Sequence, residues 1–434
     1  MRLRPRHPAH RFTTAHLASA YPLWAATADG PPGILIGEDV CGGGTAFTYD
    51  PWTLYEAQLL SNPNMAVIGQ IGRGKSAAVK AYAARSLVFG RRVIVLDRKG
   101  EYDRLCEAAG TTPIRLEPGG SVRLNPLDSR LSATAELSER DIHQDRLELL
   151  VALGGAACRR ALRPVEKAAL RVALDRAIRD TGDAEPTVGD VARALLAPTA
   201  ADAQRLGMTA RVLAESSRDV ALEFDRLVEG DLAGMVDGPT TAEIDLAHPL
   251  VVFDLSAAAR SEQALTVLMV CVAAWAQRLL QRDGGGATRS ILVLEEAWAC
   301  LNNVEVARWL RSLQKLSRQY GIQVVMVLHR FSDLAATGDE GSEVVRISAG
   351  LLADTETQVI HGMPPSEVAA TRELLGLTET EASILPDLPR GRALWRVRGR
   401  SAVVDLRLSE LERWICDTDS RMTSGAPTLA ERVA

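Results

Sequence analysis

The sequence of 434 residues lacks the marks of several protein classes. Its six cysteines are scattered and include no Cys-x-x-Cys pair, which argues against a zinc knuckle or a disulfide framework and fits a reducing cytoplasm. The longest nearly apolar run, from Ala264 to Ala276, would give a helix of ~20 Å, short of the ~30 Å hydrocarbon core of a membrane. The start of the chain contains arginine and proline but no apolar signal-peptide core. We therefore expect a cytoplasmic protein.

A strong positive charge and an ordinary number of lysines are missing too. The net charge is −5, which gives no general signature for nucleic acid. Between residues 128 and 248, 15 basic and 22 acidic residues leave a net charge of −7. Because lysine and arginine differ in shape and hydration, a retained lysine can mark a site that arginine does not fill, although chance is the alternative. Among 50 basic residues, the lysines are Lys75, Lys80, Lys99, Lys167 and Lys315.

The chain has the composition of a folded globular protein, with 47% hydrophobic and 24% charged residues. Apolar strand patterns that alternate with helical segments predict an α/β fold with a mostly parallel, doubly wound sheet. A strand over 65–69 enters a Gly-rich loop and a helix that stops at Gly90, and a second strand (RRVIVLD) follows. Later strands are expected over 249–256, 290–296 and 322–328, and a late hairpin over 392–397 and 402–408.

A helical region interrupts these strands. After Asn-Pro-Leu-Asp at 125–128 the strand signal stops, and apolar residues recur at helical spacing between Pro164 and Pro186. This apolar stripe consists of Leu170, Ala173, Leu174, Ala177 and Ile178. We therefore divide the chain into a short β-rich lead-in over 1–60, an α/β domain over 61–127 and 239–416, an acidic all-helical insertion over 128–238, and a flexible tail over 417–434.

A phosphate-binding loop is the clearest motif. Residues 69–76 (GQIGRGKS) fit the pattern GxxxxGK[ST], follow an apolar strand and open a helix, which is the context that this motif requires. Glycines let backbone N–H groups turn toward phosphate oxygens, and the helix N-terminus adds a positive dipole. We expect Lys75 to reach the β- and γ-phosphates of ATP and the hydroxyl of Ser76 to ligate Mg²⁺. The expected nucleotide-binding residues are Gly69, Gln70, Ile71, Gly72, Arg73, Gly74, Lys75 and Ser76.

Two carboxylates end a later strand, because ILVLEEAW places Glu295 and Glu296 after four apolar residues. A P-loop enzyme that hydrolyses needs one carboxylate for the Mg²⁺ shell and one that polarises the attacking water, and we assign these roles to Glu295 and Glu296. The alternative is a glutamate pair that caps a helix N-terminus. His329 ends the next strand, where a polar side chain commonly senses the γ-phosphate; an ordinary strand-end histidine is the alternative.

A basic helix face precedes the strand that ends at His329. On the helix over 304–320, four basic residues share one face and the apolar residues share the opposite face. The four are Arg308, Arg311, Lys315 and Arg318. Such a face can supply an arginine finger to a nucleotide on a neighbouring subunit, and Arg311 and Arg318 are the candidates; a solvated face is the alternative. A second basic group in the late hairpin, Arg396, Arg398 and Arg400, is interpreted as an exposed edge guarded by charge, with subunit or nucleic-acid contact as the alternative.

Together these motifs resemble the conjugation and type IV secretion ATPases of the VirB-four/TraC type, in the HerA/FtsK class of P-loop motors. VVFDLS, ILVLEEAW, the basic helix and VLHRFSDL follow one another in the order of that family, and the resemblance covers about 35–415. Two residues depart from the family pattern, because Glu295 stands where the family has Asp and His329 where it has Gln. The segment that carries the resemblance is VLDRKGEYDRL, with Asp97, Lys99, Gly100, Glu101 and Tyr102, followed by Asn125 to Asp128.

The resemblance implies a RecA-like P-loop NTPase domain that binds ATP and Mg²⁺ and assembles as a hexamer. It further implies a motor that moves a substrate or pilus subunits, together with apparatus proteins at the inner face of the membrane. With about sixty residues before the loop, the chain is expected to lack the large N-terminal domain that such proteins often carry. Two alternatives stay open. One is a DNA-translocating motor of the same class, which the mild acidity disfavours; the other is a slowly cycling nucleotide-binding scaffold, which the two departures motivate.

Overall fold

Eleven strands form one mixed sheet in the computed structural model, which describes residues 32–129, 138–241, 248–282, 289–297, 301, 303–329 and 343–417. The strands are β1 (Ile34–Asp39), β2 (Thr45–Tyr49), β3 (Met65–Ile68), β4 (Arg92–Asp97), β5 (Ile114–Arg115), β6 (Leu250–Asp254), β7 (Ser290–Leu294), β8 (Ile322–Leu328), β9 (Thr357–His361), β10 (Arg392–Val397) and β11 (Arg400–Leu406). Across the sheet they lie in the order β2-β1-β11-β10-β9-β3-β8-β7-β4-β6-β5. The pairs from β9 to β5 are parallel, and those from β2 to β9 are antiparallel.

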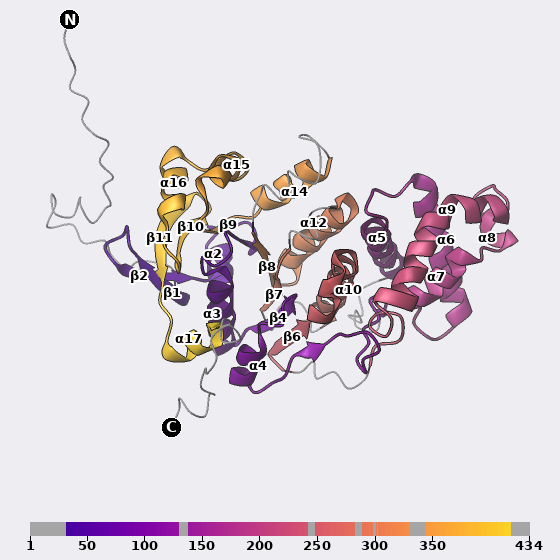
Figure 1. Ribbon diagram of the computed structural model, residues 1–434, viewed down its shortest axis with the longest axis horizontal. Coiled ribbons are helices and arrows are strands. Elements are labelled where there is room, and N and C mark those ends of the chain that lie inside the picture. The colour runs from indigo at the N-terminus through magenta and orange to yellow at the C-terminus, as the bar shows by residue number, and fades with distance from the viewer. Residues whose placement is uncertain are drawn as a thin grey trace, which may run out of the picture.

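Helices cover both faces of the parallel half of the sheet, so its strands are apolar on both sides (Figure 1). Within β4, Val93 and Val95 enter one core while Ile94 and Leu96 enter the other, because successive side chains alternate. The first core contains residues of α2 (Pro51–Glu56), α3 (Lys75–Val88), α4 (Asp103–Ala109) and α17 (Glu410–Cys416). The second contains residues of α10 (Glu262–Arg282), α12 (Val304–Gln319), α14 (Glu343–Ala353), α15 (Pro365–Leu375) and α16 (Glu379–Ile384).

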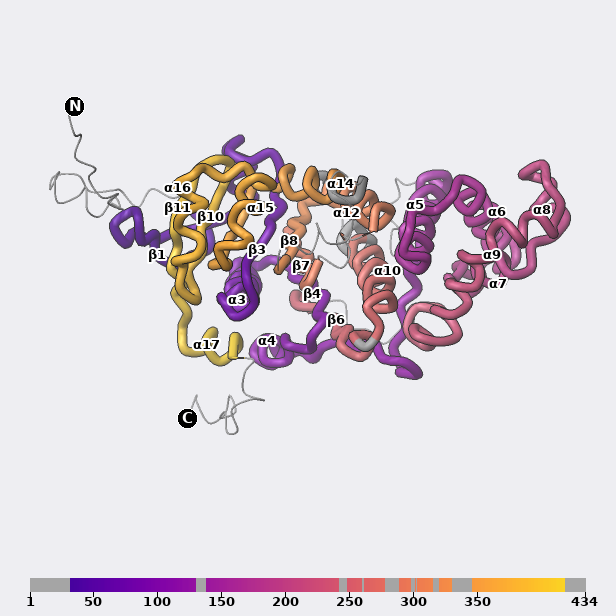
Figure 2. Tube along the Cα trace, turned by 45° about the horizontal axis from the view of Figure 1, so that its top comes forward, coloured from indigo at the N-terminus to yellow at the C-terminus, as the bar shows by residue number. Residues whose placement is uncertain are grey.

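The expected helical region forms helices throughout its described part. They are α5 (Glu139–Cys158), α6 (Pro164–Thr181), α7 (Val188–Leu196), α8 (Ala200–Gln204), α9 (Ala210–Arg226) and a π-helical turn (Leu227–Asp231). In Figures 1 and 2, α6 to α9 lie at the end of the molecule away from β1 and β2. The apolar stripe on α6 is buried, apart from the partly buried Ile178.

Helix α5 fastens this region to the α/β part, since it packs against α10 and α12. The Asn303 side chain donates a hydrogen bond of 2.7 Å to the carbonyl of Gly155. Nearby, the Lys167 ammonium lies 2.6 Å from the buried carboxylate of Glu305 at the start of α12. The helical region therefore contacts the element that carries the predicted arginine finger.

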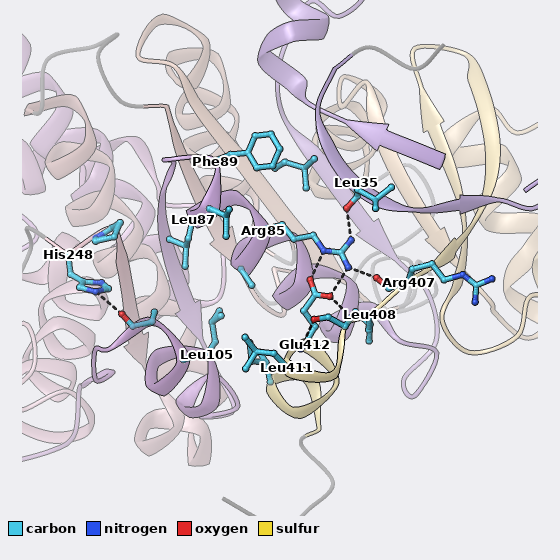
Figure 3. A pocket seen from close by; sticks show the side chains of 18 residues that line it. Leu35, Arg85, Leu87, Phe89, Leu105, His248, Arg407, Leu408, Leu411 and Glu412 are labelled. Atoms are coloured by element: carbon cyan, nitrogen blue, oxygen red, sulfur yellow. Dashed lines mark hydrogen bonds and ion pairs between the residues drawn. The ribbon is translucent and has the colours of Figure 1, made fainter. Parts of the chain in front are cut away.

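Arg85, near the end of α3, ties three distant segments together (Figure 3). Its guanidinium pairs with Glu412 of α17 and donates to the carbonyls of Leu35, Ile36 and Arg407. An apolar cavity of about 820 Å³ lies beside this ion pair, between β1, α3, α4 and α17. The cavity is at the opposite end of α3 from the predicted phosphate loop, so it is separate from that site.

All the expected strands are present, including the late hairpin, and the predicted α/β fold is confirmed. The lead-in does not stand apart, because β1 pairs with β11 and so joins the main sheet. The sheet edges within the described part are β2 and β5, so the interpretation of the hairpin as a guarded edge is wrong. Residues 1–31 and 418–434 lie outside the described residues. No helix in the part of the chain that is described combines the length and apolar character needed to span a membrane.

Candidate nucleotide site

The loop between β3 and α3 has the backbone that a phosphate cradle requires. Gly69, Gly72 and Gly74 have φ values of 146°, 80° and 100°, in a region that favours glycine. Gly74 caps α3, so the first N–H groups of this helix point toward the loop. The buried Nζ of Lys75 donates to the carbonyl oxygens of Gly69 and Gln70, at 2.5 and 3.0 Å. These features fit the polyphosphate of a nucleotide, which the predicted role of residues 69–76 requires.

The end of β9 and the segment after it pack against the phosphate loop. A Cβ atom added to Gly69 would lie 2.7 Å from the Cβ of His361, so any side chain at position 69 would clash with this histidine. The N–H of Gln70 donates to the carbonyl of Gly362 over 3.1 Å, and the N–H of Gly391 donates to the carbonyl of Arg73 over 3.2 Å. The segments that begin α15 and β10 therefore fix the shape of the loop.

His361 is a residue of this site that sequence analysis did not identify. It is fully buried, and its Nδ1–H donates to the carbonyl of Arg73 over 3.2 Å. Burial, together with the charge of Lys75, lowers the pKa of His361 to about 3. The imidazole is therefore neutral at physiological pH. The available signal was weak: a histidine that ends the short, partly polar segment TQVIH, just before a glycine.

Glu296 and His329 meet in the structure, because each follows the carboxyl end of its strand and these strands, β7 and β8, are parallel neighbours. The Nε2–H of His329 donates to Oε1 of Glu296 over 2.5 Å, and the Nζ of Lys99 lies 2.6 Å from the same oxygen. Burial alone would raise the pKa of Glu296, but the hydrogen bonds from His329 and Lys99 outweigh it and hold the pKa well below its usual range. Glu296 also has a left-handed backbone, with φ of 59°.

Glu295 has different neighbours. The hydroxyl of Tyr102 donates to its Oε1 over 2.6 Å, and burial raises the pKa of Glu295 to about 7. Lys80 is buried beside it, 5.0 Å from the centre of the Tyr102 ring and 3.9 Å from Glu101. The Mg²⁺ role of Glu295 stays a prediction. Because Oε1 accepts the hydrogen bond from Tyr102, that role would use Oε2. Three of the five lysines in the chain thus lie in or beside this site.

Asp97 at the end of β4 organises the segment that supplies Lys99 and Tyr102. One of its carboxylate oxygens accepts from the N–H groups of Lys99 and Gly100, both over 3.0 Å, and the other accepts from the N–H of Tyr102 over 3.0 Å. Burial, with Asp254 nearby, raises the pKa of Asp97 to about 6. The turn brings Lys99 to Glu296 and Tyr102 to Glu295. The Asp-x-Lys-Gly-Glu-Tyr block therefore positions side chains against both glutamates.

The basic face of α12 is exposed where it is described. Arg308 lies 3.3 Å from Glu305, and Arg311 lies 3.7 Å from Asp354. The side chains of Lys315 and Arg318 lie outside the described residues. The arginine-finger role of Arg311 and Arg318 therefore stays a prediction.

The hairpin arginines are engaged within the fold. Arg396 donates to Gln358 over 2.7 Å, and Arg398 donates to the carbonyl of Gln58 over 2.6 Å. Arg398 also sits in the hairpin turn with φ of 45°, so it does not share a strand face with Arg396. These contacts explain two of the three arginines as structural.

Residues 60–271 match the family model described as the central domain of helicase HerA. This segment is therefore similar to a HerA-type central domain. The match includes the phosphate loop and the Asp97 segment, and it confirms the resemblance to the HerA/FtsK class that the sequence indicates. No curated protein sequence matches the chain significantly.

Solved structures extend the likeness to nearly the whole chain. VirB4 of Thermoanaerobacter pseudethanolicus has a TM-score of 0.71 and 22% identity, over 89% of this chain and 99% of that one. The plasmid coupling protein TrwB in complex with ADP and Mg²⁺ has a TM-score of 0.57 and 15% identity, over 89% and 91% of the two chains. TrwB with a non-hydrolysable ATP analogue has a TM-score of 0.53 and 17% identity, over 80% and 86%. The chain therefore has the RecA-like P-loop ATPase fold that the resemblance implies.

Proposed function

We propose that the chain is a Mg²⁺-dependent ATPase that powers conjugative transfer or type IV-like secretion. The observation that carries the proposal is the meeting of a phosphate loop with a buried glutamate and a histidine at the ends of neighbouring strands. The fold of VirB4 and of the conjugative coupling protein TrwB supports the choice of apparatus. Movement of a substrate or of pilus subunits is the work that we assign to it.

Each residue of the site has a distinct task in this proposal. The loop N–H groups and Lys75 hold the phosphates, and the hydroxyl of Ser76 with the carboxylate of Glu295 holds Mg²⁺. When bound, ATP would supply the phosphoryl group that is transferred to water, and Mg²⁺ would neutralise part of the negative charge of the phosphates. Glu296 accepts the proton of the attacking water, and His329 orients Glu296 and responds to the γ-phosphate. His361 holds the conformation of the loop through its hydrogen bond to the carbonyl of Arg73.

We infer that the active form is a ring, in which Arg311 and Arg318 of one subunit face the nucleotide of the next. The exposed face of α12 supports this arrangement, since Arg308 and Arg311 point away from the core. The acidic helical insertion over 128–238 is proposed as a lobe that binds a basic protein partner, because its charge repels DNA. A location at the inner face of the membrane then comes from such partners.

The family model favours a second candidate, a DNA-translocating motor, because it describes a helicase domain. The two candidates differ in what stimulates hydrolysis. Phosphate release by the purified chain should be measured with Mg·ATP, with and without double-stranded DNA, next to Lys75→Ala. A secretion motor hydrolyses ATP at the same rate with DNA, and Lys75→Ala is inactive. Stimulation by DNA that disappears at high salt would favour the DNA motor instead.

A further inference from the structure

Lys99 bonds to the side chain that the proposed reaction uses as a base. Its ammonium lies 2.6 Å from Oε1 of Glu296, and His329 donates to that same oxygen over 2.5 Å. A carboxylate accepts a proton from water through a lone pair that faces the water. Two donors, one of them a full positive charge, occupy Oε1 and weaken the carboxylate as a base. Glu296 in this arrangement is paired rather than poised for proton transfer.

The Lys99 ammonium can move from Glu296 to a neighbouring polar cavity. Lys99 is 46% exposed, whereas Glu296 is only 6% exposed, so the lysine is the partner with room to move. Lys99 also lines a polar cavity of about 210 Å³ together with the carboxylates of Asp103, Glu117 and Asp254. Arg115 lines it too and lies 3.2 Å from Asp103 and 3.4 Å from Asp254, so three carboxylates face one guanidinium there. The backbone under Lys99 is held by Asp97, so the movement needs only the flexible side chain. The cavity therefore offers carboxylate acceptors for the Lys99 ammonium once it leaves Glu296.

We propose that Lys99 is a positioning residue that restrains Glu296 between turnovers, and that hydrolysis requires its ammonium to leave Oε1 of Glu296 for the polar cavity. This inference rests on the proposed ATPase function and adds its regulation. His329 stays on Glu296 when Lys99 leaves and keeps the carboxylate oriented. The opposite role, in which Lys99 holds Glu296 in its working position, predicts the opposite change in rate.

The test compares three variants of the full chain. Lys99→Met removes the charge and keeps the length of the side chain, while Lys99→Arg keeps a cation. Lys167→Met is a matched control, because Lys167 is also half-exposed and also lies 2.6 Å from a buried glutamate, but far from the loop in the contact between α6 and α12. Each protein is assayed for kcat and KM of phosphate release and for binding of a non-hydrolysable ATP analogue.

Loss of one charge-assisted hydrogen bond from a half-exposed donor should raise kcat about 3- to 10-fold in Lys99→Met, with KM and analogue binding unchanged. Lys99→Arg, which keeps a cation beside Glu296, should show no such rise in kcat, and Lys167→Met should hydrolyse like the wild type. A lower kcat in Lys99→Met with intact binding would assign Lys99 to the working arrangement and overturn the proposal. An unchanged kcat would overturn it too.

A second comparison keeps the proposal testable if Lys99→Met folds poorly. Asp254→Asn removes one acceptor from the cavity, so it should lower kcat when Lys99 is present and have no effect in the Lys99→Gln background. An equal effect in both backgrounds would contradict the proposed movement. If neither the wild type nor any Lys99 variant releases phosphate while all bind the analogue, the ATPase function itself is wrong. If the wild type hydrolyses and Lys99→Met is no faster, only the restraint is wrong.

Discussion

Replacing Glu296 by glutamine isolates proton acceptance from every other property of that side chain. Glutamine has the same length, and its amide oxygen still accepts hydrogen bonds from His329 and Lys99, which lie 2.5 and 2.6 Å from Oε1 of the glutamate. The amide does not accept a proton from water. Because a positioned general base contributes ~10²–10⁴ to a rate, kcat of Glu296→Gln should fall by about that factor. Binding of ATP should persist, since the loop and Lys75 are untouched.

The assay is single-turnover phosphate release, with equilibrium binding of a fluorescent ATP analogue measured on the same sample. Glu305→Gln serves as the control, because Glu305 is equally buried and paired with a lysine but belongs to α12. Hydrolysis at the wild-type rate by Glu296→Gln would refute the assignment of the base. Loss of analogue binding would show that Glu296 acts on affinity rather than on chemistry.

Four further predictions concern the rest of the site and its frame. If Glu295 holds the Mg²⁺ shell, Glu295→Ala should require more Mg²⁺ for half-maximal activity, while Glu295→Asp keeps the wild-type requirement. His361 has a folded pKa of about 3, below its unfolded value of 6.5, so its stabilising contribution is present above pH 6.5 and is lost as the pH falls toward 3. The urea-unfolding free energy of the wild type should decrease below pH 6.5 by up to about 1.4 kcal/mol per pH unit relative to His361→Gln. Arg85→Ala breaks the ion pair with α17 and should cost about 3 kcal/mol in urea unfolding, without loss of analogue binding. If Arg311 completes the site of a neighbouring subunit, a mixture of Lys75→Ala and Arg311→Ala chains should recover activity that neither has alone; an inactive mixture of assembled chains would place the finger elsewhere.

Local sequence pattern was sufficient to predict the elements that carry the site. The phosphate loop is recognisable from the sequence, because its glycines, lysine and serine follow a buried strand and open a helix. The structure has β3 and α3 at those positions. Strand β8 was also predictable, since seven apolar or amide residues directly precede His329. The pairing of Glu296 with His329 follows once both residues end adjacent parallel strands.

Long-range pairing was not predictable from the same patterns. Strand β9 is short and contains polar residues, so neither it nor the role of His361 beneath Gly69 was recognised. The union of β1 with β11 joins residues that are hundreds of positions apart, and no local signal encodes it. The adjacent glutamates face different partners because Glu296 has a positive φ, which a pattern of two acids does not reveal.

The separate roles of the lysines needed the structure as well. Their scarcity in the sequence marks positions of interest but does not say which acid each one meets. Lys99 reaches Glu296, whereas Lys80 stays buried near Glu101 and Tyr102, where its Nζ has no hydrogen-bond partner among the described residues. Burial lowers the pKa of Lys80, which separates it from the half-exposed Lys99.

We expect this chain to hydrolyse ATP at the loop of residues 69–76. Steady-state phosphate release by the purified wild type and by Lys75→Ala, with Mg·ATP and across a range of protein concentrations, tests it most directly. Turnover per chain of the wild type should rise as rings assemble, and Lys75→Ala should release no phosphate above background. Equal phosphate release by the two proteins, or none from a wild type that binds ATP and assembles, would contradict it.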